Sequence, residues 1–496
     1  MLSGYYGYPR RQENTVTVFD VTIVGAGPAG SALAAHLARD GYAVLLLERE
    51  RFPRDKVCGD LVSAKALKLL ADLGCYGEIK RRGYVPIQES AVYLDDEFLI
   101  KAPIPRIAEY PPFGHAIPRL ELDELILSAA LAGGAQVIEA CTVLDCQVGP
   151  THVVVDAAVG HERRRFRSRI VVGADGASST IARCAGLDMR DPRYVQLAIR
   201  AYCRGMPLEH AVLVFAEDFF PGYGWIFPVN DSVANIGVGM VKESVQKDGI
   251  RLKRFYSQFA AFVRNMALEM NAEIELTRPM GWPIKTYGGA NRNYFERGLL
   301  IGDAGCFVDP ISGEGIPFAL ETAGMAAATI REAFAKNDFG VAAMSQFERR
   351  WRSVYDADLG VSDLVVSAIR NRHLVKFWIH GLRVMGLTAA QDRKYALKVG
   401  GILAGLVPNR EGFSPEIVLK SVMHGPAFWM RALDLTPDNL AGDVVRKGTE
   451  LLKWQTQLAS AMMTDFDWFS DWALEIGSKQ IRVLNTLISP GKRHSA

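Results

Sequence analysis

A glycine-rich turn near the N-terminus limits the folds open to this chain: Gly25-Ala26-Gly27-Pro28-Ala29-Gly30. It follows the apolar run Phe19–Val24 and opens the alanine-rich stretch Ser31–Leu37, so we expect a strand, a tight turn and a helix in that order. Gly25 allows the turn, Gly27 lets the backbone approach a pyrophosphate, and Gly30 lets the helix pack against the strand. The pattern is typical of a Rossmann-like α/β unit that binds a dinucleotide at a helix N-terminus.

A second apolar run strengthens this interpretation. Tyr42–Glu48 is expected to be a buried strand that ends in an acid, and Glu48 follows Gly25 at the distance where a carboxylate accepts hydrogen bonds from the adenosine ribose. The cofactor residues predicted in this unit are Gly25, Gly27, Ala29, Gly30, Glu48 and Arg49.

A second glycine-rich turn lies far along the chain, at Gly302-Asp303-Ala304-Gly305. The short apolar run Arg297–Ile301 precedes it, and the loop Phe307–Ile316 leads from it into a predicted helix at Pro317–Ala328. A helix that starts after such a loop presents free amides and a positive dipole end, which suit an electron-rich ring or a ribityl oxygen.

With a third segment, Val171–Ser179, the chain resembles the FAD-binding superfamily that includes p-hydroxybenzoate hydroxylase, geranylgeranyl reductases and flavin halogenases. The resemblance implies an α/β fold of the p-hydroxybenzoate hydroxylase type, with FAD as cofactor. It also implies that the first motif holds the ADP half, and that Asp175 and Gly176 support the pyrophosphate. By the same resemblance Asp303 contacts ribityl or ribose hydroxyls.

The resemblance assigns further residues to the cofactor. Gly313, Gly315 and Ile316 are expected along the flavin ring, and Arg119, at the start of a predicted helix, matches an arginine that packs near the FAD phosphates.

The segment Phe52–Asp60 narrows the chemistry. Its Lys56-Val57-Cys58-Gly59 portion resembles the Lys-x-Cys-Gly segment of geranylgeranyl reductases, in which the cysteine faces the substrate side of the flavin. Halogenases carry a His-x-Gly-Glu-Ser segment here, which this chain lacks. We predict that Cys58 donates a proton and that Gly59 adjoins the cofactor; the alternative is that Cys58 only packs.

An aromatic repeat completes the predicted site. Tyr223, Trp225 and Phe227 fit a Tyr-x-Trp-x-Phe-Pro signature of the same reductases, in which the aromatic rings help to form a groove for an isoprenoid chain. Such a chain carries no charge and must be held by apolar contact, worth about 25 cal/mol per Å². The alternative is a core strand without a ligand.

The resemblance implies an FAD-dependent oxidoreductase that acts on an apolar isoprenoid or polyene-like substrate by reducing a carbon–carbon double bond. The rival function is a monooxygenase that hydroxylates or epoxidises an aromatic or isoprenoid compound. A thiol beside the reacting oxygen would be prone to oxidation, so Cys58 favours the reductase. Because no second GxGxxG unit occurs, NAD(P)H that binds transiently or an external reductase is expected as electron donor.

Composition limits the partners and the compartment. A net charge of +2 argues against a nucleic-acid partner. Seven cysteines without a CxxC pair indicate neither a disulfide framework nor a metal site, and so predict a cytoplasmic protein. Residues Met1–Asn14 lack the apolar core of a signal peptide and are expected to form a loose arm.

The pattern of apolar runs predicts several domains. We assign 17–190 and 290–336 to a discontinuous FAD-binding domain and 191–289, with its alternating short runs, to an antiparallel β-sheet substrate domain. Residues 337–425 are expected to form a helical region, and 426–496 a helical extension.

One expected helix, Leu364–Leu387, carries Arg370, Arg372, Lys376 and Arg383 among apolar residues. A basic amphipathic helix can lie on a membrane surface, which would make the protein membrane-associated. The alternative is a helix packed on the FAD-binding domain with a solvated basic face. The sequence leaves the oligomeric state open.

Overall fold

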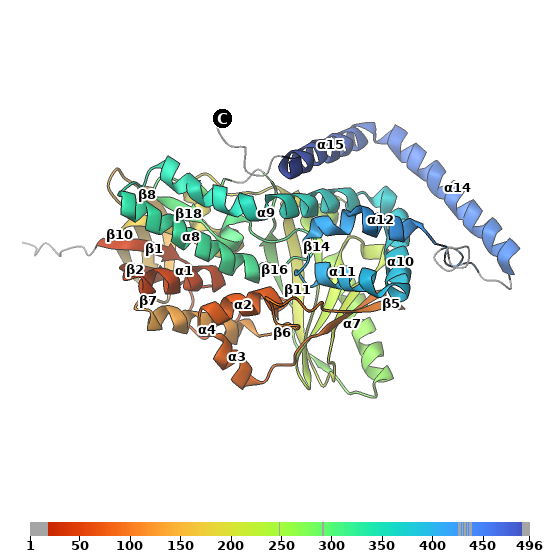
Figure 1. Ribbon diagram of the computed structural model, residues 1–496, viewed down its shortest axis with the longest axis horizontal. Coiled ribbons are helices and arrows are strands. Elements are labelled where there is room, and N and C mark those ends of the chain that lie inside the picture. Colours follow the sequence, from red (N-terminus) through yellow and green to blue (C-terminus); the bar gives the residue numbers. More distant parts are fainter. Residues whose placement is uncertain are drawn as a thin grey trace, which may run out of the picture.

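Two large sheets, the helices that pack on them and a set of C-terminal helices form most of the part of the chain that the computed structural model describes (Figure 1). That part is residues 18–488, without 248, 290–291, 425–427, 429, 431–432, 434 and 436–438. The predicted N-terminal arm, Met1–Asn14, lies outside the described residues.

The first sheet has eight strands and confirms the predicted Rossmann-like α/β fold. Its main path runs β17-β18-β10-β1-β2-β7, with parallel pairing from β18 to β7. Buried apolar strands such as β1 explain this, because a parallel sheet covered on both faces needs nearly continuous apolar runs. The strands are β1 Val18–Val24, β2 Val44–Leu47, β7 Gln136–Ile138, β8 Cys141–Val148, β9 Val153–Val159, β10 Glu162–Gly173, β17 Tyr294–Phe295 and β18 Gly298–Leu300.

Helices cover one face of this sheet and build the largest apolar core. α1 contacts both α4 and α8, and their alanine-rich faces pack against β1 and β2. The helices of this part are α1 Pro28–Arg39, α2 Ala64–Asp72, α3 Tyr76–Arg82, α4 Arg119–Ala132, α5 Thr180–Cys184 and α8 Ile316–Lys336. A two-stranded sheet joins β3 (Leu61–Val62) to β6 (His115–Ala116).

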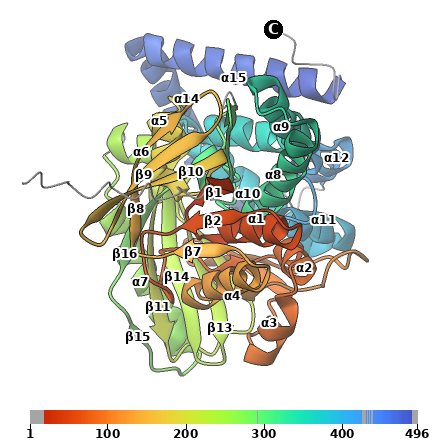
Figure 2. The same ribbon diagram turned by 90° about the vertical axis from the view of Figure 1, so that its left-hand side faces the viewer.

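The second sheet also has eight strands and is antiparallel except between β4 and β12. Figure 2 shows it standing beside the first sheet. One face packs against α7. The elements are β4 Glu89–Leu94, β5 Glu97–Pro103, β11 Val195–Arg204, β12 Ala211–Phe215, β13 Tyr223–Asn230, β14 Val233–Val241, β15 Glu275–Leu276, β16 Met280–Lys285, α6 Lys242–Lys247 and α7 Leu252–Glu269.

The strands β4 and β5 belong to a different sheet from the one predicted for their part of the chain. They lie within the segment 17–190 that the sequence assigned to FAD binding, yet they extend the second sheet beyond β12. Alternating apolar residues predict a half-buried strand, but they do not indicate which sheet offers the free edge.

The chain is helical after α8, as predicted, but Leu364–Leu387 is not one helix. α9 ends at Ile369, and α10 begins at Val375. Between them the Asn371 side chain accepts a hydrogen bond from the His373 amide (3.0 Å), which starts a new turn. The helices are α9 Val341–Ile369, α10 Val375–Gln391, α11 Arg393–Leu403, α12 Pro415–Val422, α14 Leu440–Thr464 and α15 Phe466–Ile488.

Because of the break between α9 and α10, the basic residues predicted for one face of a single helix do not share one face. Arg370 is buried and forms ion pairs with Glu243 and with Glu475 (2.8 Å to the latter), so it is not available to a lipid surface. Arg383 pairs with Glu97 at 3.0 Å. No helix among the described residues is both long and apolar enough to span a bilayer.

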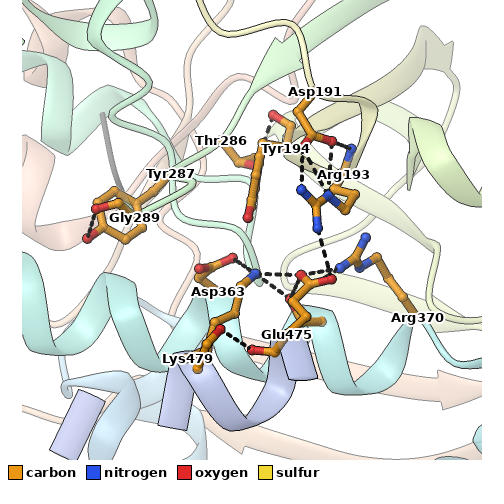
Figure 3. A network of polar contacts seen from close by, with 12 residues as sticks. Asp191, Arg193, Tyr194, Thr286, Tyr287, Gly289, Asp363, Arg370, Glu475 and Lys479 are labelled. Carbon is orange, nitrogen blue, oxygen red and sulfur yellow. Dashed lines mark hydrogen bonds and ion pairs between the residues drawn. The ribbon is translucent and has the colours of Figure 1, made fainter. Parts of the chain in front are cut away.

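The last two helices form an arm. In Figure 1, α14 projects from the rest of the molecule, and α15 returns along α9. Figure 3 shows how α15 is fastened: the Glu475 carboxylate accepts from Arg193 (3.1 Å), Arg370 and Lys479 (2.8 Å each). Lys479 also reaches Asp363 on α9 at 2.7 Å. α15 is therefore held by a largely buried polar network.

Candidate functional site

The three glycine-containing motifs meet at the carboxyl ends of β1, β10 and β18. Gly25 has a φ of +98°, and any side chain there would overlap the Ala174 carbonyl of the third motif. Gly302 has a φ of +55°, and a Cβ atom on it would lie 2.9 Å from that of Ala29. Ligands of open α/β sheets bind at this edge of the sheet, so the fold gathers the predicted cofactor residues where they are needed.

Two helices begin at this edge with free backbone donors. α1 starts at Pro28 after Gly27, and α8 starts at Ile316 after Gly315. Within the described chain, no side chain caps either helix start, so the amides of the first turns remain available. Such N-termini favour negative charge and electron-rich groups, and these two fit a pyrophosphate and a flavin ring.

Glu48 follows β2 and supports the first turn. Its Oε2 atom accepts a hydrogen bond from the Ala26 amide (2.8 Å), and its Oε1 atom accepts one from the Glu50 amide (3.0 Å). Arg54 lies 3.7 Å from the same carboxylate and approaches Gly27 with its guanidinium. Sequence reasoning missed Arg54, although it stands within the segment that was singled out for Cys58.

Arg119 is held at the start of α4 by an ion pair within the helix. It is buried, and it donates to both oxygens of Asp123 at 2.6 and 2.7 Å. Burial opposes its charge, but Asp123 and the neighbouring Cys58 thiol hold its pKa above the usual value. Asp123 also accepts from Arg54 at 2.9 Å, so a chain of charges links the first turn to Cys58.

The segment around Cys58 is fixed from two sides. Lys56 pairs with Asp303 of the second glycine turn at 3.2 Å. From the second sheet, Arg200 donates to Asp55 at 2.7 Å and to the Lys56 carbonyl at 3.2 Å. Cys58 itself is half-buried, next to the Arg119 guanidinium. The structure thus places the cysteine between the cofactor loops and the second sheet.

The predicted aromatic residues form one wall of this junction. Trp225 and Phe227 are buried on β13 with ring centroids 6.4 Å apart at 22°, and the Tyr223 hydroxyl donates to the Ser312 carbonyl. A Cβ atom on Gly59 would lie 3.4 Å from the Trp225 indole nitrogen and 3.5 Å from the Phe227 ring. Gly59 therefore lets the cysteine segment lie directly against this wall.

The loop expected along the flavin ring touches the same sheet. A Cβ atom on Gly313, whose φ is +68°, would lie 3.4 Å from the Tyr223 hydroxyl. A Cβ atom on Gly315 would lie 3.4 Å from the Asp303 carboxylate. The second glycine turn, the ring loop and the aromatic wall are therefore contiguous.

Glu314, between these two glycines, was also missed. Burial raises its pKa to about 7, and its Oε1 atom has no hydrogen-bond partner among the residues described. An acidic residue flanked by loop glycines was the available signal.

Asp175 of the third motif lies against the first glycine turn, since a Cβ atom on Gly25 would lie 2.8 Å from its Cα atom. Asp175 uses its carboxylate to accept from the Ser179 hydroxyl and the Thr180 amide (2.6 Å) at the start of α5, and Gly176 follows with a φ of +76°. Arg49 is exposed, 3.6 Å from Glu50, and lies over the Trp282 ring. The structure does not bring these residues to Cys58.

Comparisons with known proteins agree with this geometry. Residues 18–335 match the family model described as FAD binding domain. A menaquinone reductase of Mycolicibacterium smegmatis is 34% identical over 62% of this chain and 75% of its own length. A digeranylgeranylglycerophospholipid reductase of Methanopyrus kandleri is 30% identical over 68% and 83%. A solved geranylgeranyl bacteriochlorophyll reductase-like protein of Thermoplasma acidophilum superposes with a TM-score of 0.64 at 19% identity, over 84% of this chain and 99% of its own.

Proposed function

The chain belongs to the FAD binding domain family and is an FAD-dependent oxidoreductase, and we propose that it reduces a carbon–carbon double bond in an isoprenoid-like substrate. One observation carries the proposal: the segment of Cys58 and Gly59 lies against the wall of Trp225 and Phe227, with the Arg119 guanidinium beside the Cys58 thiol. The reductases that the chain resembles support the same reaction, since two of them are named for isoprenoid-bearing molecules.

The residues at the sheet edge fit FAD. The uncapped start of α1, with Gly25, Gly27 and Gly30, would hold the pyrophosphate, and Glu48 would accept from the adenosine ribose. Asp303 would bind the ribityl chain, while the loop at Gly313 and Gly315 would lie along the ring. When bound and reduced, FAD supplies a hydride to the substrate.

Reduction of a double bond also requires a proton. Hydride forms one new C–H bond as the π bond breaks, and the electron pair of that bond takes a proton at the other carbon. The Cys58 thiol supplies this proton and is left as a thiolate beside the Arg119 guanidinium. Solvent then restores the thiol, and NAD(P)H or an external reductase supplies the electrons.

The aromatic wall selects the substrate class. Trp225 and Phe227 present buried ring surface next to Gly59, whereas a charged or highly polar substrate would lose its hydration there without compensation. An extended apolar chain gains free energy in proportion to the area that it covers. This wall supports an isoprenoid or polyene.

The second candidate is a monooxygenase of an aromatic or isoprenoid compound. The same buried rings favour it, because oxygen chemistry on a flavin needs a site from which water is excluded. The half-buried thiol at Cys58 weighs against it, since thiols oxidise readily in such surroundings.

The variant Cys58→Ser tests the proposal. Serine keeps the shape but is a much weaker acid, so the flavin should still be reduced at a near-normal rate while double-bond saturation slows by about 10²-fold. Cys184→Ser, at an exposed cysteine, is the matched control. Stopped-flow absorbance and product analysis measure the two steps separately.

If Cys58→Ser leaves saturation unchanged, Cys58 is not the proton donor. An equal loss of FAD binding and turnover would instead assign the residue a structural role.

A further inference from the structure

A buried asparagine on β14 links the cysteine segment to the aromatic wall. The Asn235 amide nitrogen donates to the Cys58 carbonyl (2.9 Å) and to Asp60 Oδ2 (2.7 Å). Its carbonyl oxygen accepts from the Trp225 indole N–H (2.9 Å). Both ends of one fully buried amide are therefore used, and only this orientation satisfies all three contacts.

Asp60 fixes that orientation. It is fully buried with a φ of +62°, a left-handed conformation that aspartate tolerates better than most residues. Its Oδ2 atom accepts from the Tyr202 hydroxyl (2.6 Å) as well as from Asn235. Without an acceptor at this position, the Asn235 amide could turn over, and its NH₂ group would then face the indole N–H of Trp225.

The cysteine segment and the aromatic wall, which Asn235 joins, lie in close contact. Gly59 lies between Cys58 and Asp60, and a Cβ atom on it would lie 3.4 Å from the Trp225 ring nitrogen. A shift of this segment would therefore move the Cys58 thiol relative to the surface on which the substrate is proposed to lie.

We propose that Asn235 and Asp60 are positioning residues that hold Cys58 in register with the wall of Trp225 and Phe227. The kinetic consequence rests on the proposed function, whereas the structural consequence does not. Neither role was predicted from the sequence, because Asp60 and Asn235 are hydrogen-bonded to each other across 175 positions of the chain.

The structural test measures how fast iodoacetamide alkylates Cys58 in the FAD-loaded protein, by peptide mass spectrometry. Asn235→Ala and Asp60→Ala should free the segment and raise the rate at Cys58 by about fivefold, the scale of one lost hydrogen bond. Asp60→Asn should stay near the wild-type rate, because its side-chain oxygen can still accept from Tyr202 and Asn235. Alkylation of the exposed Cys184 should not change in any variant.

Two further variants serve as a control and as a milder version of the same test. Asn371→Ala removes another fully buried asparagine far from the site and should leave the Cys58 rate unchanged. Trp225→Phe keeps an aromatic ring but removes the indole N–H, so it should raise the rate in the same direction as Asn235→Ala, by a smaller factor. This milder change keeps the inference testable if the alanine variants do not fold.

Equal Cys58 rates in wild type, Asn235→Ala, Asp60→Ala and Trp225→Phe would overturn the inference, as would an Asp60→Asn variant that behaves like Asp60→Ala. With an isoprenoid substrate, Asn235→Ala should lower kcat about tenfold while the rate of flavin reduction is kept. A wild-type protein that saturates no double bond would end the proposed function but leave the alkylation result valid.

Discussion

At the scale of single residues, the site relies on a few carboxylates whose surroundings differ sharply. Glu48 accepts two backbone amides at the first glycine turn, Asp303 pairs with Lys56, and Asp60 is buried among hydrogen-bond donors. We therefore expect substitutions of these carboxylates to change different measurable properties of the protein.

Glu48→Ala should weaken FAD binding by about 1 to 3 kcal/mol, because it removes the acceptor that holds the Ala26 amide and would meet the ribose. Titration of the apoprotein with FAD, followed by fluorescence, measures this. Asp20→Ala is the control, since Asp20 accepts from the Ala43 amide at an exposed position outside the turn. Equal affinities for Glu48→Ala and wild type would remove Glu48 from the cofactor site.

Asp60 makes stability depend on pH in a predictable direction. Burial raises its pKa from 3.8 to about 7, against the opposing effects of Tyr202, Asn235 and Arg200. The folded protein therefore retains a proton that the unfolded chain loses, so stability falls as the pH rises from about 4 to about 7.

The Asp60→Asn side chain has no proton to lose, so the stability of this variant should not fall for this reason as the pH rises. Between pH 5 and pH 7, the free energy of unfolding of wild type should fall relative to this variant by on the order of 1 kcal/mol per pH unit. Urea unfolding at several pH values measures it. Parallel curves for the two proteins would show that Asp60 is ionised in the folded state.

At the scale of elements, the C-terminal helix α15 is held on α9 partly by a network of ion pairs around Glu475. Burial opposes the charge of Glu475, but Arg370, Lys479 and Arg193 lower its pKa to about 2. The contribution of this carboxylate to docking is thus complete above its usual pKa of 4.5 and is lost as the pH falls toward 2.

Glu475→Gln should loosen α15 at neutral pH, because three cations lose their shared anion at a cost of about 3 kcal/mol. Hydrogen exchange of residues 466–488 should rise, while exchange in β1 and β2 should not. Glu450→Gln, on the exposed side of α14, is the matched control. Unchanged exchange in Glu475→Gln would mean that apolar contacts alone hold the helix.

The same network of ion pairs removes Arg370 from the residues that could contact a membrane. Because Arg370 is committed to Glu243 and Glu475 and Arg383 pairs with Glu97, contact with anionic lipid through 364–387 would have to involve other basic residues, such as the exposed Lys376. We keep membrane contact as a proposal that liposome pelleting of a Lys376→Gln variant can test: weaker binding to anionic vesicles would support it, and unchanged pelleting would contradict it.

At the scale of the whole molecule, local sequence patterns predicted the cofactor fold well. Apolar runs that end in glycine turns indicated β1, β18 and the start of α1, because backbone conformation there depends on neighbouring residues. The contact of Arg119 with Cys58 was not predictable, since the two residues are far apart in the sequence, whereas its pairing with Asp123 lies within one helical turn. Contacts such as Glu475 with Arg193, 282 positions apart, leave no local pattern at all.

We propose that this flavoprotein saturates a double bond with a proton from Cys58. The most direct test is anaerobic turnover of an isoprenoid substrate in heavy water, with product analysis by mass spectrometry and NMR. We predict a saturated product with solvent-derived deuterium on at least one of the two former double-bond carbons, and strongly reduced formation of it by Cys58→Ser. A product formed only in air, carrying an oxygen atom from O₂ and an intact carbon skeleton without saturation, would contradict the account.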